Sequence, residues 1–226
     1  MPMPITQTDV AARVHAYLRA NLQTTQWIRD YDRVYHDFGP SSGRSAAERL
    51  AEFADVARQH GWGMNRKGQC VTIRASLRTT AGTVPAERIL AAADDIRTEL
   101  RPMEKPCDVA LLTARIAVIQ QELGRLHQSA DTNCFVTKVV LMFGTGQSPA
   151  FDGRVARKLD IRTVRMTAAE LSGWLIRLGE QARESSDACG SPLAQLVTNA
   201  VRAKLPTLSI REVPPGRAVD MLLFAA

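Results

Sequence analysis

Apolar residues recur at helical spacing along most of the chain. In residues 6–23, Val10, Val14, Leu18 and Leu22 fall on one helical face, with polar residues between them. Similar patterns occupy residues 24–39, 41–63, 83–103, 105–130, 133–143, 152–159, 167–185, 191–205 and 216–226. The alternation of apolar and polar residues that marks a half-buried strand is scarce. The pattern therefore predicts an all-α fold, a compact multi-helix domain.

Residue types that begin helices precede several of these segments. They are Thr8 or Asp9, Ser45 with Glu48, Pro85, Thr167 with Glu170, and Ser191 with Pro192. The Ser/Thr-x-x-Glu pairs are capping boxes, in which side chains satisfy the first backbone N–H groups of a helix. Proline suits the first turn of a helix, because that turn needs no N–H from it.

The loops between these segments are short, and no internal repeat is visible, which predicts a single helical domain over residues 1–226. If the chain divides, the irregular basic region near residues 62–84 is the expected boundary. Residues 85–190 would then form one lobe that carries the candidate chemistry, and residues 1–60 with 191–226 would form the second.

Composition narrows the function classes. No stretch reaches the roughly 18 consecutive apolar residues of a membrane helix, and the first residues lack a signal-peptide pattern. The four cysteines are widely spaced and the histidines show no ligand spacing, so we expect a cytoplasmic protein with reduced thiols and no metal. No phosphate-binding or dinucleotide-binding glycine pattern is present, so no cofactor is predicted.

The distribution of charge points to DNA as a partner. The chain of 226 residues has a formal charge of +6. Residues 57–86 contain no acid, and residues 138–177 contain seven basic residues against three acids. Two such segments on one face could hold a polyanion. The alternative is that they are solvated surfaces of arginine-rich helices.

One lysine and one aspartate stand out in the stretch TKVVLMFGTGQSPAFDGRVARKL, residues 137–159. Lys138 lies at the start of an apolar run, where burial near a helix N-terminus would lower the pKa of its amine and favour its use as a nucleophile. Asp152 precedes a basic helical segment and occupies the position of an N-cap, which would hold its carboxylate ionised. The alternative is a solvated lysine and a simple helix cap.

Residues 138–159 resemble the second half of the catalytic core of the helix-hairpin-helix DNA glycosylases, in particular the 8-oxoguanine glycosylase branch. That family has a lysine on an apolar helix, a short loop with a proline, and an aspartate that heads a helix. Where the family has Leu-Pro-Gly-Val-Gly before the lysine, this chain reads SADTNCFVT, so the hairpin motif is missing. The resemblance implies an all-helical fold and cleavage of the N-glycosidic bond of a modified or damaged base.

The resemblance also implies roles for individual residues. Lys138 would attack the sugar C1′ or contact a phosphate, and Asp152 would stabilise positive charge on the sugar. A missing hairpin is compatible with an unusual modified base, including hypermodified phage DNA, and with a role in repair or in antiviral defence. The alternative is a non-catalytic helical module that binds DNA or protein.

Further residues are candidates for binding rather than chemistry. The candidate DNA contacts are basic, namely Arg154, Arg157, Lys158, Arg66 and Lys67. The candidates for a base pocket are Asn133, Asp131, Trp27 and Tyr31. An extruded base is held by aromatic faces and a few polar groups, which these residue types supply. The alternatives are a solvated basic surface, core aromatics and helix caps.

Overall fold

The computed structural model describes residues 5–19, 24–60, 73–99, 108–127, 133–144 and 166–225. All regular elements in these ranges are helices, so the predicted all-α, compact fold is confirmed. In chain order they are α1 (Gln7–Arg19), α2 (Thr24–Asp37), η1 (Pro40–Ser42), α3 (Ala46–His60), α5 (Thr80–Glu99), α6 (Val109–His127), α7 (Asn133–Phe143), α9 (Ala168–Cys189), α10 (Leu193–Lys204) and α11 (Pro215–Ala225).

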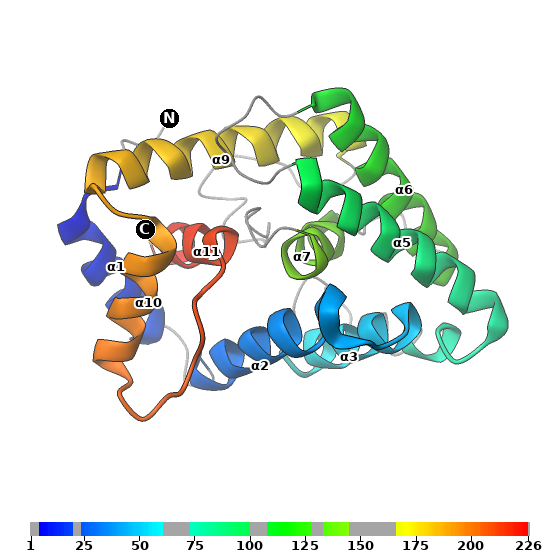
Figure 1. Ribbon diagram of the computed structural model, residues 1–226, viewed down its shortest axis with the longest axis horizontal. Coiled ribbons are helices and arrows are strands. Elements are labelled where there is room, and N and C mark those ends of the chain that lie inside the picture. Colours follow the sequence, from blue (N-terminus) through cyan, green and yellow to red (C-terminus); the bar gives the residue numbers. More distant parts are fainter. Residues whose placement is uncertain are drawn as a thin grey trace.

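Helix α7 is the centre of the molecule. Figure 1 shows it almost end-on, with the other helices arranged around it. It packs against α2, α5 and α6, and every α7 side chain that the structure describes is buried. A largely apolar helix is stable only when other parts of the protein cover it on most sides. The apolar run within residues 133–143 is in keeping with this central position.

An aromatic cluster joins α3 to α7. The ring of Phe53 lies 5.0 Å from that of Phe135 and 5.7 Å from that of Phe143, and all three side chains are fully buried. The second pair meets edge to face, a favourable arrangement of ring quadrupoles. The cluster fixes how α3 lies against the central helix.

Helix α9 connects two groups of helices. Its 22 residues span about 33 Å at 1.5 Å per residue. It contacts α6 on one side of the molecule and α10 and α11 on the other (Figure 1). Helices α1, α10 and α11 pack against one another, and α3, α5, α6 and α7 form the other group. Of the proposed boundary between lobes, residues 62–72 lie outside the described residues, and the division stays a prediction.

Both predicted capping boxes are present. The Glu48 N–H donates to Ser45 Oγ at 3.3 Å, and the Ser45 N–H donates to the Glu48 carboxylate at 2.9 Å. Thr167 and Glu170 form the same reciprocal pair before α9. At α1 the prediction was wrong by two residues, because Thr6 forms this reciprocal pair with Asp9.

Two other predicted helix starts are also displaced. Helix α5 begins at Thr80, and Pro85 lies inside it rather than at its start. The turn before α5 lies so close to the first turn of that helix that a Cβ on Gly82 would be 2.0 Å from the Ser76 carbonyl oxygen. This close approach explains the glycine at position 82. Helix α10 is preceded by Pro192 as its cap, one residue later than expected.

The segment of residues 205–214, which we call the strap, connects α10 to α11 and positions the latter. The buried Thr198 side chain of α10 binds the strap. Its Oγ1 atom accepts a hydrogen bond from the Val213 N–H at 2.9 Å and donates one to the Ala194 carbonyl at 2.7 Å. Arg202 donates to the Ile210 carbonyl at 2.9 Å. The strap is therefore tied to α10 by buried and half-buried hydrogen bonds.

We expect Thr198→Val to lower the free energy of unfolding by about 1–3 kcal/mol, because the isosteric change leaves the buried Val213 N–H without this acceptor. Urea unfolding followed by circular dichroism measures the loss. Thr198→Ser is the matched control, since it keeps the hydroxyl and removes only a methyl group. An unchanged stability in Thr198→Val together with a loss in Thr198→Ser would show that packing, not the hydrogen bond, holds the strap.

Candidate functional site

Lys138 lies in the middle of α7, as the sixth of its 11 residues. The expectation that it stands at a helix start is therefore wrong, and the helix macrodipole, which acts within the terminal turns, contributes little there. Its burial is the stronger feature, because only 4% of the residue is exposed. The Nζ atom donates to the Tyr31 hydroxyl of α2 at 3.3 Å.

A second buried basic residue also contacts Tyr31. Arg217 of α11 is 5% exposed, and its guanidinium carbon is 4.2 Å from the centroid of the Tyr31 ring. It donates to the Asp220 carboxylate and to the Tyr17 hydroxyl of α1. Four helices, α1, α2, α7 and α11, thus meet in one buried polar cluster, which consists of Tyr17, Tyr31, Lys138, Arg217 and Asp220.

Burial and neighbouring charges set the protonation states in this cluster. Burial raises the pKa of Tyr17 to about 12, against the opposing effect of Arg217. Burial also raises the pKa of Tyr31, although Lys138 and Arg217 act to lower it. Burial disfavours the charge of Arg217, but its interactions with Tyr17, Asp220 and Tyr31 outweigh this and raise the pKa of the guanidinium. At neutral pH both phenols are therefore neutral and Arg217 is charged.

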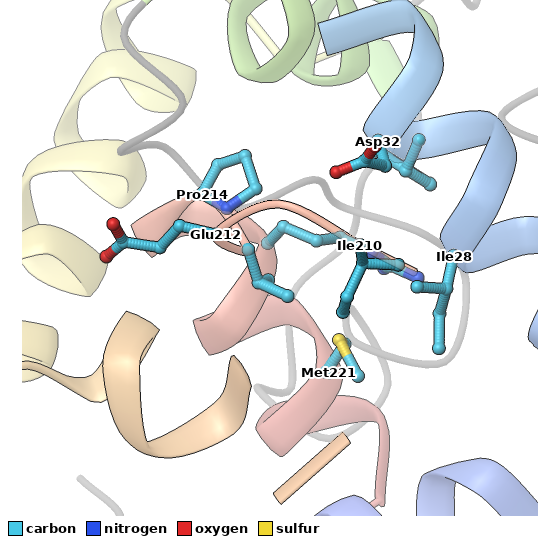
Figure 2. A pocket seen from close by; sticks show the side chains of 9 residues that line it. Ile28, Asp32, Ile210, Glu212, Pro214 and Met221 are labelled. Carbon is cyan, nitrogen blue, oxygen red and sulfur yellow. The ribbon is translucent and has the colours of Figure 1, made fainter. Parts of the chain in front are cut away.

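A small pocket opens beside this cluster, between α2, the strap and α11. We call it the α2–α11 pocket. It is lined by Ile28, Tyr31, Asp32, Ile210, Glu212, Val213, Pro214, Arg217 and Met221. Figure 2 shows Ile28 and Asp32 on one wall, with the Glu212 carboxylate directed away from them. Its volume of about 20 Å³ is room for about one water molecule.

Arg211 of the strap fastens the rim of this pocket to α2. Its side chain donates to Asp32 Oδ2 at 3.0 and 3.1 Å and to Asp37 Oδ1 at 2.7 Å. The hydrogen bond from Arg211 lowers the pKa of Asp37. Because the Arg211 and Asp37 side chains are about half exposed, breaking their ion pair exchanges a surface contact for water.

The structure brings together two of the predicted site residues. Lys138 and Tyr31, predicted separately as nucleophile and base contact, are hydrogen-bonded partners. Asn133 lies apart from them, where its amide oxygen accepts from Gln120 at 2.8 Å and its amide nitrogen donates to the Met166 carbonyl at 3.2 Å. Asn133 therefore links α7 to α6 and to the start of α9.

The other predicted residues cannot be placed by this structure. Asp152, Asp131, Arg154, Arg157, Lys158, Arg66 and Lys67 lie outside the described residues. Trp27 belongs to α2, but its side chain is also outside what the structure describes. The roles of Asp152 and Lys138 in one site stay a prediction.

Sequence reasoning missed Arg217 and Asp220. The sequence of residues 216–226 predicts a short apolar helix, and this pattern assigns no role to either charge. The available signal was two opposite charges three residues apart in an otherwise apolar segment. Such a pair in the middle of a helix that is apolar around it indicates a buried ion pair.

Comparison of the chain with models of known protein families, with curated proteins and with solved structures gave no match. Within the described residues, no group of histidine, cysteine, aspartate and glutamate side chains is arranged to hold a metal ion. None of the described helices is both long and apolar enough to cross a membrane.

Proposed function

We propose that the protein is a DNA glycosylase-like enzyme that cleaves the N-glycosidic bond of a modified or damaged base. The observation that carries the proposal is the buried amine of Lys138, which the central helix places against Tyr31 at the wall of the α2–α11 pocket. Burial of a charged amine costs several kcal/mol unless its charge is compensated, and the unprotonated amine is the form that can act as a nucleophile.

The chemistry that an amine supplies is covalent. The Lys138 nitrogen attacks the sugar C1′, an N–C1′ bond forms, and the bond between C1′ and the base breaks. The base leaves with the electron pair and takes the proton that the amine loses. Opening of the sugar then transfers the remaining N–H proton to the ring oxygen and leaves a Schiff base.

The second group in the proposed mechanism is the carboxylate of Asp152, which is assigned from the sequence alone. It follows Lys138 in the same order of features as in the glycosylases, after an apolar run and a loop with a proline, and its negative charge would stabilise the sugar cation as the base departs. Entry of a base requires the α2–α11 pocket to widen, and the exposed Arg211 contacts are the ones that such a movement would break.

One observation favours a second function, a non-catalytic helical module that binds DNA or protein. The Lys138 ammonium is almost fully buried and already hydrogen-bonded to Tyr31, so it can act as a tie between α7 and α2. In that case the lysine holds the fold together and the basic segments provide a binding surface.

The test is an excision assay on labelled duplexes that each contain one modified base, such as 8-oxoguanine, uracil, hypoxanthine or 5-hydroxymethylcytosine. We expect abasic sites in at least one duplex, and borohydride trapping of a protein–DNA adduct. Asp152→Asn is expected to lower excision at least 100-fold, because transition-state charge stabilisation is worth that much. Lys138→Gln is expected to abolish the adduct.

Lys138→Gln keeps a long polar side chain, so loss of the adduct in a variant with wild-type thermal stability assigns it to the amine. Duplex binding that weakens steeply with salt, without abasic sites in any duplex, would support the binding module instead. Excision that survives Asp152→Asn would remove the carboxylate from the mechanism.

A further inference from the structure

Tyr31 is the residue that Lys138 and the α2–α11 pocket share. Its ring lines the pocket, and its hydroxyl accepts the hydrogen bond from Lys138 Nζ. Tyr31 is 4% exposed, as Lys138 is, so water does not compete for this hydrogen bond. Tyr31 therefore connects the amine to the wall of the pocket.

Tyr31 is itself in contact with Arg217. The Arg217 guanidinium lies 4.2 Å from the ring centroid, within the range of a cation–π contact. Arg217 is in turn fixed by Asp220 on its own helix and by Tyr17 on α1. The position of the Tyr31 hydroxyl is thus set by a chain of buried contacts that reaches the N-terminal and C-terminal helices.

We infer that Tyr31 is a positioning residue for Lys138, which aims the amine toward the α2–α11 pocket, and that Arg217 keeps Tyr31 in place for this task. The inference rests on the proposed function, because aiming an amine has a catalytic effect only if the amine attacks. A neutral phenol can hold an amine in either protonation state, since it accepts from an ammonium and donates to a free amine.

A positioned amine and a merely buried one behave differently when the hydroxyl is removed. Tyr31→Phe keeps the ring and its contact with Arg217, so the fold is expected to stay intact. The amine, which loses this hydrogen bond, should react faster with a small reagent that approaches from any direction. It should react more slowly with a sugar that is held in one orientation, because misalignment of reacting atoms raises the barrier.

The experiment measures both reactions. The first is cyanoborohydride trapping of the protein on a duplex with a single apurinic site, at several DNA concentrations. We expect Tyr31→Phe to lower the maximal trapping rate about tenfold, the effect of one hydrogen bond, and to change the half-saturating DNA concentration less than twofold. The second is trace acetylation of Lys138 in the protein alone, read by peptide mass spectrometry against the exposed Lys204, which we expect to rise severalfold.

Tyr35→Phe is the matched control, since it makes the same change one turn further along α2 and should alter neither reaction. The inference is overturned if both reactions slow, if neither changes, or if trapping slows while acetylation does not rise. In each of these cases Tyr31 does not position the amine. If acetylation rises but the wild-type protein forms no adduct on any duplex, Tyr31 does hold the amine, and it is the glycosylase function that fails.

Discussion

Asp220→Ala is expected to lower the free energy of unfolding by about 3–5 kcal/mol, which is the usual cost when one partner of a buried ion pair is removed. Asp220 and Arg217 are 2% and 5% exposed, so the remaining guanidinium has little access to water. The loss should appear in urea unfolding as a lower midpoint with an unchanged slope. Salt should affect it little, because buried charges are poorly screened.

The double variant Arg217→Met with Asp220→Ala identifies the origin of this loss. It removes both charges, so no buried ion is left without its partner, and the two changes should be far less than additive. We expect the double variant to be more stable than Asp220→Ala alone. A double variant that is the less stable of the two would show that packing around Asp220, rather than the stranded charge of Arg217, sets the cost.

The same cluster shows where sequence reasoning stops. The capping boxes at Ser45 and Thr167 and the helix over residues 133–143 were predictable, because they depend on contacts within three or four residues of the chain. The contact between Tyr17 and Arg217 joins residues 200 positions apart. Helical periodicity says which face of α11 is apolar, but it does not say which helix that face meets.

The candidate site was predictable in part for the same reason. Lys138 was singled out as the lone charge in an apolar run, and its burial follows from that pattern. The predicted helix over residues 133–143 already places Lys138 in mid-helix, where the helix dipole has little effect on the pKa of its amine. Its hydrogen bond to Tyr31 depends on how α2 crosses α7, which is a tertiary contact. At Pro85 a local rule failed, because helix α5 extends back to Thr80, past Gly82, where the preceding turn leaves no room for a side chain.

Phe53→Ala is expected to lower the free energy of unfolding by about 3–5 kcal/mol, the usual cost of deleting a large buried ring. Phe53 is fully buried and contacts two rings of the central helix, so the change opens a cavity between α3 and α7. Because α7 also carries Lys138, we expect trapping on apurinic DNA to fall when the cavity lets that helix shift. Chemical denaturation and the trapping rate of the folded fraction measure the two effects.

Phe53→Leu is the control that separates packing from position. It keeps most of the buried volume and should cost less than half as much as Phe53→Ala, with trapping close to the wild-type rate. If both variants lose trapping equally while their stabilities differ, the ring contacts themselves, and not the filled volume, hold the central helix in register. If neither loses trapping, α2 alone positions the amine through Tyr31, and α3 acts only on stability.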